Sequence, residues 1–212
     1  MIIKTFIEPP IENNNYLIID EVAKEAALID CSFNDEDIKL TLEKYGAVLK
    51  YILLTHGHFD HIAGLEPHPS LKILGIKHKY PSVLVHENDM GWIEEVNTYL
   101  PMVGLPSMEV PTITDFIKDG DVIEVGSLKI KVIHTPGHTQ GGVCFYVDGV
   151  LFSGDTIFKE AVGRCDLPGG NFEQLVESIK NKIFTLPDET IIYPGHGQKT
   201  NVGWEKEHNQ YL

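Results

Sequence analysis

The fold and the chemistry of this chain are decided by one stretch, Thr55-His56-Gly57-His58-Phe59-Asp60-His61. It follows Tyr51-Ile52-Leu53-Leu54, a short apolar run that indicates a buried strand. Three imidazoles and one carboxylate therefore leave the end of a strand together, and Gly57 lets the backbone turn between two of the histidines. Histidine nitrogens and carboxylate oxygens are ligands of zinc, iron and manganese. The stretch predicts a metal site; the alternative, a polar surface loop, does not explain such a concentration of ligand groups.

Three later loops carry residues of the same chemical type. They hold His138 in Thr135-Pro136-Gly137-His138-Thr139, Asp155 in Ser153-Gly154-Asp155, and His196 in Pro194-Gly195-His196-Gly197. Each loop follows an expected strand, and a rigid scaffold that presents functional loops is the usual arrangement. With the first stretch they make seven candidate ligands, which is too many for one tetrahedral ion. The set divides naturally between two ions with one carboxylate bridging them.

The composition bounds the class of protein. The chain has 212 residues, of which 42% are hydrophobic, so it can form one large domain or two small ones. Because the candidate ligands are spread along the chain, we expect a single domain over residues 1–212. The formal net charge is −14, which argues against a nucleic-acid partner, since that binding needs a cationic face. Bound divalent cations would offset part of this charge.

The cysteines and the apolar runs indicate the cellular compartment in which the protein is expected. Cys31, Cys144 and Cys165 are odd in number, and their spacing fits neither a disulfide framework nor a zinc knuckle, which favours a reducing cytoplasm. The start of the chain does not resemble a signal peptide. No apolar run approaches the roughly 20 residues that span a bilayer, so no membrane partner is expected.

Periodicity predicts the elements that carry these loops. We expect strands over 2–7, 16–20, 26–30, 49–54, 82–86 and 191–193, hairpins over 121–133 and 143–153, and helices over 35–45, 87–95, 171–182 and 204–212. A Pro-Pro and Asn-rich turn is expected before residue 16, and a helix from Ile62 would be interrupted at Pro67 and Pro69. Residues 99–112 suit no regular element; they form either a loop packed on the core or a flap that lines a substrate pocket. The order of elements favours a sandwich of sheets with helices outside.

The four ligand motifs, in this order, resemble the metallo-β-lactamase superfamily over the whole chain. The resemblance implies an α/β (α+β) fold, a four-layer αββα sandwich of two mixed sheets with external helices. It implies that one divalent ion is held by His56, His58 and His138, and a second by Asp60, His61 and His196. Asp155 would bridge the two ions, which would share a water or hydroxide, and Asp60 and Asp155 would be catalytic. Zinc is the favoured metal, with iron and manganese as the alternatives.

Within the superfamily the chain is similar to the glyoxalase II-like, hydroxyacylglutathione hydrolase branch. The similarity lies in Phe152-Ser153-Gly154-Asp155-Thr156-Ile157-Phe158, in Gly163-Arg164-Cys165-Asp166-Leu167-Pro168-Gly169-Gly170-Asn171, and in the ending from Tyr193 to Leu212. It implies hydrolysis of a small-molecule thioester such as S-2-hydroxyacylglutathione. Longer members carry a C-terminal helical domain that grips glutathione. This chain departs from them by stopping soon after His196, so recognition of glutathione is left open, as is the oligomeric state.

Several other residues need an interpretation. His134 flanks the same turn as His138 and is expected to have a supporting role, whereas His68, His78, His86 and His208 match no motif. Arg164 could bind a substrate carboxylate or pair with Asp166 or Asp155, and both alternatives stay open. Cys165 is interpreted as a passive small residue rather than a thiol with a lowered pKa.

Three other functions remain alternatives for this sequence. A mononuclear-iron persulfide dioxygenase is similar in fold and in its Gly-Arg-x-Asp loop, but its last ligand loop is of the Pro-Ala-His-Asp type and not the Pro-Gly-His-Gly found here. A metal-stabilised interaction module would have closed metal sites. A nuclease is disfavoured by the negative charge.

Overall fold

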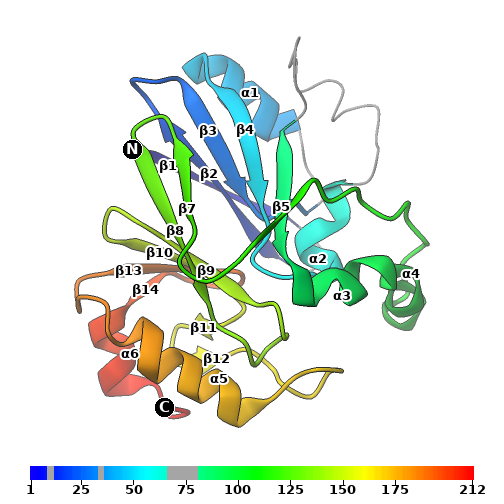
Figure 1. The fold of residues 1–212 in the computed structure, drawn as a ribbon, viewed down its shortest axis with the longest axis vertical. Coiled ribbons are helices and arrows are strands. Elements are labelled where there is room, and N and C mark those ends of the chain that lie inside the picture. Colours follow the sequence, from blue (N-terminus) through cyan, green and yellow to red (C-terminus); the bar gives the residue numbers. More distant parts are fainter. Residues whose placement is uncertain (9–11, 33–35, 66–80) are drawn as a thin grey trace.

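A computed structural model describes residues 1–8, 12–32, 36–65 and 81–212. These residues form two six-stranded mixed sheets and one small two-stranded sheet (Figure 1). The first sheet has the order β1 (Ile2–Glu8), β2 (Asn13–Asp20), β3 (Glu25–Ile29), β4 (Val48–Leu53), β5 (Ser82–His86) and β6 (Asp115–Ile117). The second has the order β14 (Thr200–Asn201), β13 (Ile191–Pro194), β10 (Val150–Gly154), β9 (Val143–Val147), β8 (Leu128–His134) and β7 (Val122–Val125), while β11 (Ile157–Phe158) pairs with β12 (Ala161–Val162).

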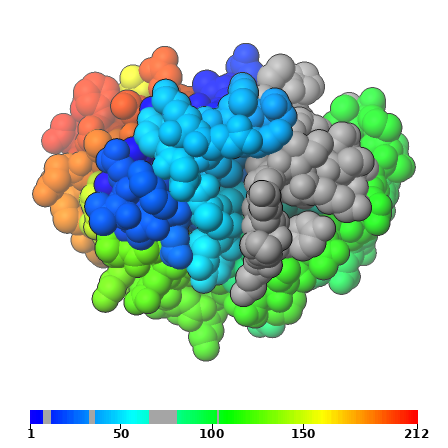
Figure 2. Space-filling view, turned by 90° about the horizontal axis from the view of Figure 1, so that it is seen from above, coloured from blue at the N-terminus to red at the C-terminus, as the bar shows by residue number. Residues whose placement is uncertain are grey.

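Helices lie on the outer sides of both sheets. They are α1 (Glu36–Tyr45), α2 (Phe59–Ile62), α3 (Met90–Glu94), α4 (Val96–Tyr99), α5 (Phe172–Ser178) and α6 (Val202–His208). Short 3-10 turns cover Ala63–Leu65, Glu87–Asp89 and Leu100–Val103, and a π-helical turn, Ile179–Ile183, continues α5. Seen from above, α1 and the neighbouring strands of the first sheet form the near face (Figure 2). None of the helices in the described ranges is long and apolar enough to cross a bilayer.

Three buried clusters explain the layers. Because side chains alternate between the faces of a strand, Leu17 of β2 faces α1 with Leu42, whereas Ile18 faces the second sheet with Phe145. A third cluster joins the second sheet to α5 and α6, with Leu175 of α5 at its centre. The order helix, sheet, sheet, helix confirms the predicted αββα sandwich.

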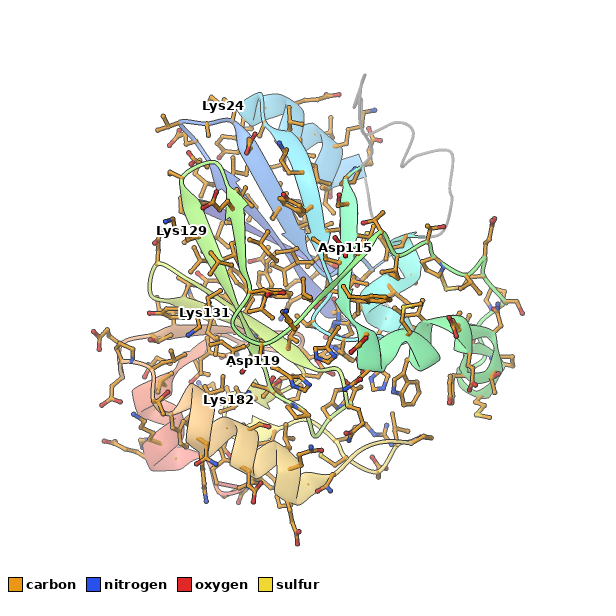
Figure 3. The ribbon with its side chains drawn as sticks, viewed as in Figure 1. Lys24, Asp115, Asp119, Lys129, Lys131 and Lys182 are labelled. Carbon is orange, nitrogen blue, oxygen red and sulfur yellow. The ribbon has the colours of Figure 1, made fainter. Side chains whose placement is uncertain are left out.

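Local sequence accounts for several element boundaries. The Asp148-Gly149 pair joins β9 to β10 with both residues at positive φ, 48° and 79°, as a tight hairpin turn requires. Asn171 caps α5 as predicted, because its side chain accepts a hydrogen bond from the Gln174 amide at 3.0 Å. Beyond α5, Lys182 Nζ donates to the backbone oxygen of His134 at 2.7 Å and pairs with Asp119 at 3.2 Å, which ties the helix to β8 (Figure 3).

Three expectations differ from the structure. Residues 13–15 belong to β2 and not to a turn, and α6 begins at Val202, earlier than expected. Residues 99–112 contain the end of α4 and a 3-10 turn, where no regular element was expected. Met102 in that turn lines a cavity, whereas Leu105 and Met108 beyond it pack on the core. Each of the two alternatives therefore describes part of the segment. Strands β6, β11, β12 and β14 are too short to show a pattern of their own. The expected interruption at Pro67 and Pro69, and the histidines at 68 and 78, lie outside the described residues.

Replacing Gly137 with alanine is expected to destabilise the fold by roughly 2–4 kcal/mol. Gly137 has φ +140°, and a Cβ there would overlap the backbone of Leu175 in α5. Urea unfolding of Gly137→Ala checks this. The control is Gly91→Ala on α3, where a Cβ meets nothing within 4 Å, and which is expected to be neutral or slightly stabilising. Equal stability of the two variants would contradict the packing described.

Candidate metal centre

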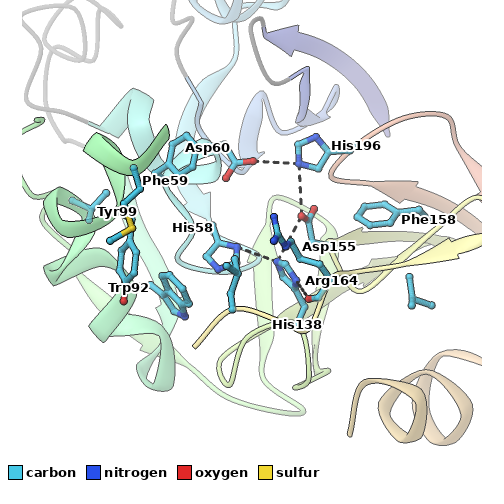
Figure 4. Close-up of a pocket in the computed structure, with 14 residues that line it drawn as sticks. His58, Phe59, Asp60, Trp92, Tyr99, His138, Asp155, Phe158, Arg164 and His196 are labelled. Atoms are coloured by element: carbon cyan, nitrogen blue, oxygen red, sulfur yellow. Dashed lines mark hydrogen bonds and ion pairs between the residues drawn. The ribbon is translucent and has the colours of Figure 1, made fainter. Parts of the chain in front are cut away.

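Four loops from both sheets meet at one edge of the sandwich. After β4, the loop carries His56 and His58, and α2 carries Asp60 and His61. The loops after β8, β10 and β13 carry His138, Asp155 and His196. All seven predicted residues are brought together there. Figure 4 shows His58, Asp60, His138, Asp155 and His196 among them. They form two groups, with Asp155 between them.

The first group consists of three buried imidazoles. His58 Nδ1 lies 3.1 Å from His56 Nε2 and 3.0 Å from His138 Nε2, and the two Nε2 atoms are 3.3 Å apart. Each of the three residues is at most 8% exposed. Three nitrogens from loops 80 residues apart in the sequence therefore converge on one point.

The second group combines a carboxylate with two imidazoles. Asp60 Oδ2 lies 3.2 Å from His196 Nε2 and 3.7 Å from His61 Nε2. Asp155 stands between the groups, with Oδ1 3.5 Å from His61 Nε2 and Oδ2 3.6 Å from His138 Nε2. Its carboxylate therefore lies close to histidines of both groups.

Hydrogen bonds turn the lone pairs of these histidines inward. The backbone oxygen of Arg164 can only accept, so His138 Nδ1 donates to it at 2.7 Å and Nε2 is left with its lone pair. Asp30 acts in the same way on His61, because its Oδ2 accepts from His61 Nδ1 at 2.8 Å. Asp30 also accepts from the Thr55 hydroxyl at 2.9 Å, which leaves the Thr55 oxygen to accept from His56 Nδ1 at 3.1 Å.

This donor set fits divalent cations. The lone pairs of His138 Nε2 and His56 Nε2 face one another at 3.3 Å, and a cation between them would remove their repulsion. A tetrahedral zinc ion, with Zn–N distances of about 2.0–2.1 Å, places its ligand atoms about 3.3–3.4 Å apart, close to the separations of the first group. Asp155 Oδ1 is buried and makes no hydrogen bond to any described residue, as expected for an oxygen that binds an ion.

Burial and charge set the protonation of the cluster. Burial, helped by the neighbouring imidazoles, lowers the pKa of His56 far below its usual value and that of His58 to about 3. Burial alone would also lower the pKa of His61, but Asp30, Asp60 and Asp155 outweigh it and raise that pKa. Burial opposes ionisation of Asp155, yet His61 and His138 lower its pKa. At neutral pH His56 and His58 are neutral and Asp155 is ionised, which are the forms that bind metals.

Sequence reasoning missed three residues that support the cluster. Asp30, directly after β3, was interpreted only as the last residue of a strand. A carboxylate at the end of a strand that neighbours the histidine loop could have indicated a hydrogen-bond acceptor for one of the histidines. Asn13 places its side-chain amide nitrogen 2.8 Å from His61 Nε2. Asp89 is fully buried and accepts from the amides of Gly57 and Gly141 and from the Thr139 hydroxyl, at 2.9, 2.6 and 2.8 Å.

Replacing Asp30 with asparagine is expected to weaken zinc binding by about 10- to 100-fold, because an amide cannot accept the same hydrogen bonds and His61 loses its orientation. Competition with a chromogenic chelator measures the affinity. Asp20→Asn is the control, since Asp20 is also buried and accepts from three backbone amides, but at the turn after β2. It should lower stability and leave zinc affinity unchanged; equal affinity in Asp30→Asn would contradict the role given to Asp30.

The remaining candidate residues lie around the cluster. Arg164 forms an ion pair with Asp166, with Nε to Oδ1 at 2.7 Å and Nη2 to Oδ2 at 2.8 Å, and not with Asp155. Burial raises the pKa of Cys165, so the lowered-pKa alternative is wrong. His134 lies outside the cluster, where its Nε2 donates to the backbone oxygen of Gln140 at 2.9 Å and its ring stacks on His86.

A cavity of about 620 Å³ opens over the cluster. His58, Asp60, His138, Asp155 and His196 all line it, so a small molecule within it would reach the candidate metal ligands.

Comparison with known proteins agrees with this geometry. Residues 9–196 match the family model described as the metallo-beta-lactamase superfamily. The chain is 33% identical over 208 residues to a Haemophilus influenzae protein described as hydroxyacylglutathione hydrolase GloC, covering 95% of this chain and 93% of that one. Among solved structures, the BLEG-1 B3 metallo-beta-lactamase has a TM-score of 0.87 at 32% identity, covering 100% of this chain and 99% of that one. TTHA1623, crystallised in a di-iron-bound form, has a TM-score of 0.82 at 31% identity, covering 99% and 100%. The chain therefore belongs to the metallo-beta-lactamase superfamily, whose fold implies divalent metal ions and suggests a metal-dependent hydrolase.

Proposed function

We propose that the chain hydrolyses small-molecule thioesters, such as S-2-hydroxyacylglutathione, with the help of two divalent ions, most consistent with zinc. The observation that carries the proposal is the pair of ligand groups joined by Asp155 at the floor of a cavity. His56, His58 and His138 would hold one ion, Asp60, His61 and His196 the other, and Asp155 both. The nitrogen and oxygen donors suit zinc, and also iron or manganese.

Thioester hydrolysis at this centre needs an activated water, an electrophilic carbonyl and a leaving thiolate. When bound, the ions supply a Lewis acid for the carbonyl oxygen and lower the pKa of a water molecule to about 7. Histidine charge lowers the pKa of Asp60 and Asp155 against the effect of burial, so both carboxylates are ionised and able to orient an attacking water. A thiolate with a pKa of about 8.5 leaves without much help from a general acid, and none is needed from the chain.

The relatives and the composition support this choice. The Haemophilus influenzae relative is described as a hydroxyacylglutathione hydrolase, and a neighbour binds two iron ions. The net charge of −14 favours a small-molecule substrate over a nucleic acid. The described residues contain no disulfide, which fits work in a reducing cytoplasm.

A substrate panel tests the proposal. Protein stripped of metal and reloaded with zinc is mixed with S-D-lactoylglutathione, acetyl-CoA and an aryl thioester, and loss of the thioester absorbance is followed. Hydrolysis of at least one substrate is expected in the wild type and in His208→Ala, whose histidine lies far along α6, but not in His196→Ala. The proposal fails if no thioester is cleaved. Oxygen uptake by the iron-loaded protein with glutathione persulfide would favour the dioxygenase alternative instead.

A further inference from the structure

The cavity has walls of different chemistry. One carries the candidate metal ligands, and another is apolar. The apolar wall comes from α2, from α3 and α4, and from the 3-10 turn that follows them, and it consists of Phe59, Trp92, Val96, Tyr99 and Met102. In Figure 4, Phe59, Trp92 and Tyr99 stand on one side of the histidines, and Phe158 stands on the other. Because ligand sites bury most of a small molecule, this wall has to cover part of the substrate.

The apolar wall starts at a candidate ligand. The Trp92 ring lies 4.4 Å from the His58 ring, centre to centre and nearly perpendicular to it. The Tyr99 ring lies 4.6 Å from the Trp92 ring and extends the same surface. A substituent on the carbon next to a carbonyl at the cluster, if directed toward α3, would lie against Trp92.

The charged residues of the cavity also favour an apolar substituent at this wall. Among the described residues that line it, Arg164 is the one lysine or arginine. Both of its bonded nitrogens face the carboxylate of Asp166, and its side chain is 62% exposed, so its charge is compensated and solvated. A carboxylate placed against Trp92 and Tyr99 would lose water without gaining a partner. An uncharged group suits that surface.

We propose that the wall formed by Trp92, Tyr99 and Met102 selects thioesters whose acyl group carries an uncharged apolar substituent, aromatic or branched aliphatic, over those that carry only a methyl group. The inference rests on the proposed hydrolysis and adds the class of acyl group. Aromatic rings add contact with Trp92 and Tyr99 beyond the area that they bury. Differences of this size in an apolar pocket change kcat/KM by about 10- to 100-fold.

Two thioesters on one carrier test the inference. S-D-lactoylglutathione and S-mandeloylglutathione differ by a methyl and a phenyl group at the same carbon. With zinc-loaded protein, the mandeloyl compound is expected to have a kcat/KM about tenfold higher or more. The ratio of the two values should fall toward one in Tyr99→Ala and Trp92→Ala and stay high in Trp92→Phe.

The ratio separates selection from damage to the site. Damage to His58 would slow both substrates equally and leave the ratio unchanged, so a fall in the ratio reports selection. Trp92 contacts His58, whereas the Tyr99 ring contacts Trp92. Phe116→Ala, at an exposed aromatic residue of β6 outside the cavity, is the control and should keep the wild-type ratio. A ratio near one in the wild type, or an unchanged ratio in Tyr99→Ala, overturns the inference.

A binding measurement decides the inference even without turnover. The chain has two tryptophans, and Trp204 lies on α6, stacked on His208. In zinc-loaded Trp204→Phe protein, fluorescence reports on Trp92 alone, and mandelate is expected to bind about tenfold tighter than lactate. Equal binding of the two acids overturns the inference. If neither thioester is hydrolysed, the proposed function fails while this comparison still decides the role of the wall.

Discussion

Replacing Asp155 with alanine is expected to lower kcat/KM for thioester hydrolysis by about a thousandfold or more, because the ions that it would bridge supply several kcal/mol of transition-state stabilisation. Asp155 is the described carboxylate that lies within 3.7 Å of histidines from both groups. Its loss would remove a ligand from each of the two proposed ions at once. Steady-state kinetics of the zinc-loaded variant, with its metal content, measures the effect.

The control removes another aspartate. Asp188 pairs with Lys206 at 2.6 Å, and its side chain is 69% exposed. Since such surface pairs contribute about 0–1 kcal/mol, Asp188→Ala should keep full activity and metal content. Thermal melting of both variants shows that each is folded. Wild-type turnover in folded Asp155→Ala would exclude the bridging role.

Replacing Asp89 with alanine is expected to have the second largest effect, a loss of about 3 kcal/mol or more of stability together with weaker metal binding. The carboxylate joins the loop of His56 and His58, through the Gly57 amide, to the turn after His138, through Thr139 and Gly141. Alanine would leave these buried donors without an acceptor, at a cost of about 1–3 kcal/mol for each unsatisfied group.

Urea unfolding and zinc competition measure the two effects separately. Asp89→Asn is the conservative variant, because its amide oxygen can still accept from part of the set while its amide nitrogen faces a donor. It should fall between wild type and Asp89→Ala in both stability and zinc affinity. An alanine variant that is destabilised but binds zinc as tightly as wild type would show that Asp89 only supports the fold.

The sequence predicted the ligand loops because their signals are local. His56, His58, Asp60 and His61 follow one apolar run, and the other ligands each follow an expected strand beside glycine or proline. The hairpin at Asp148-Gly149 and the cap at Asn171 are local signals too. Local sequence patterns, together with a family resemblance, therefore predicted most of the fold and named all seven residues of the cluster.

What the sequence could not show depends on distant partners. Asn13 to Asn15 have the composition of a turn, yet they form the start of β2. Asn14 donates to the backbone oxygens of Pro194 and Gly197, more than 170 residues away, and Asn15 accepts from the Ser32 amide. Hydrogen bonds of this range override local propensity and leave no trace in the neighbouring residues. Asp89 was missed for the same reason.

The proposed function requires that these loops bind a pair of cations. Equilibrium dialysis against zinc, followed by elemental analysis, measures the number of ions bound per chain. We predict two zinc ions per wild-type chain and about one in His196→Ala, which removes a ligand of only the second group. A wild-type chain that retains no zinc, or a zinc content that His196→Ala leaves unchanged, would contradict the account.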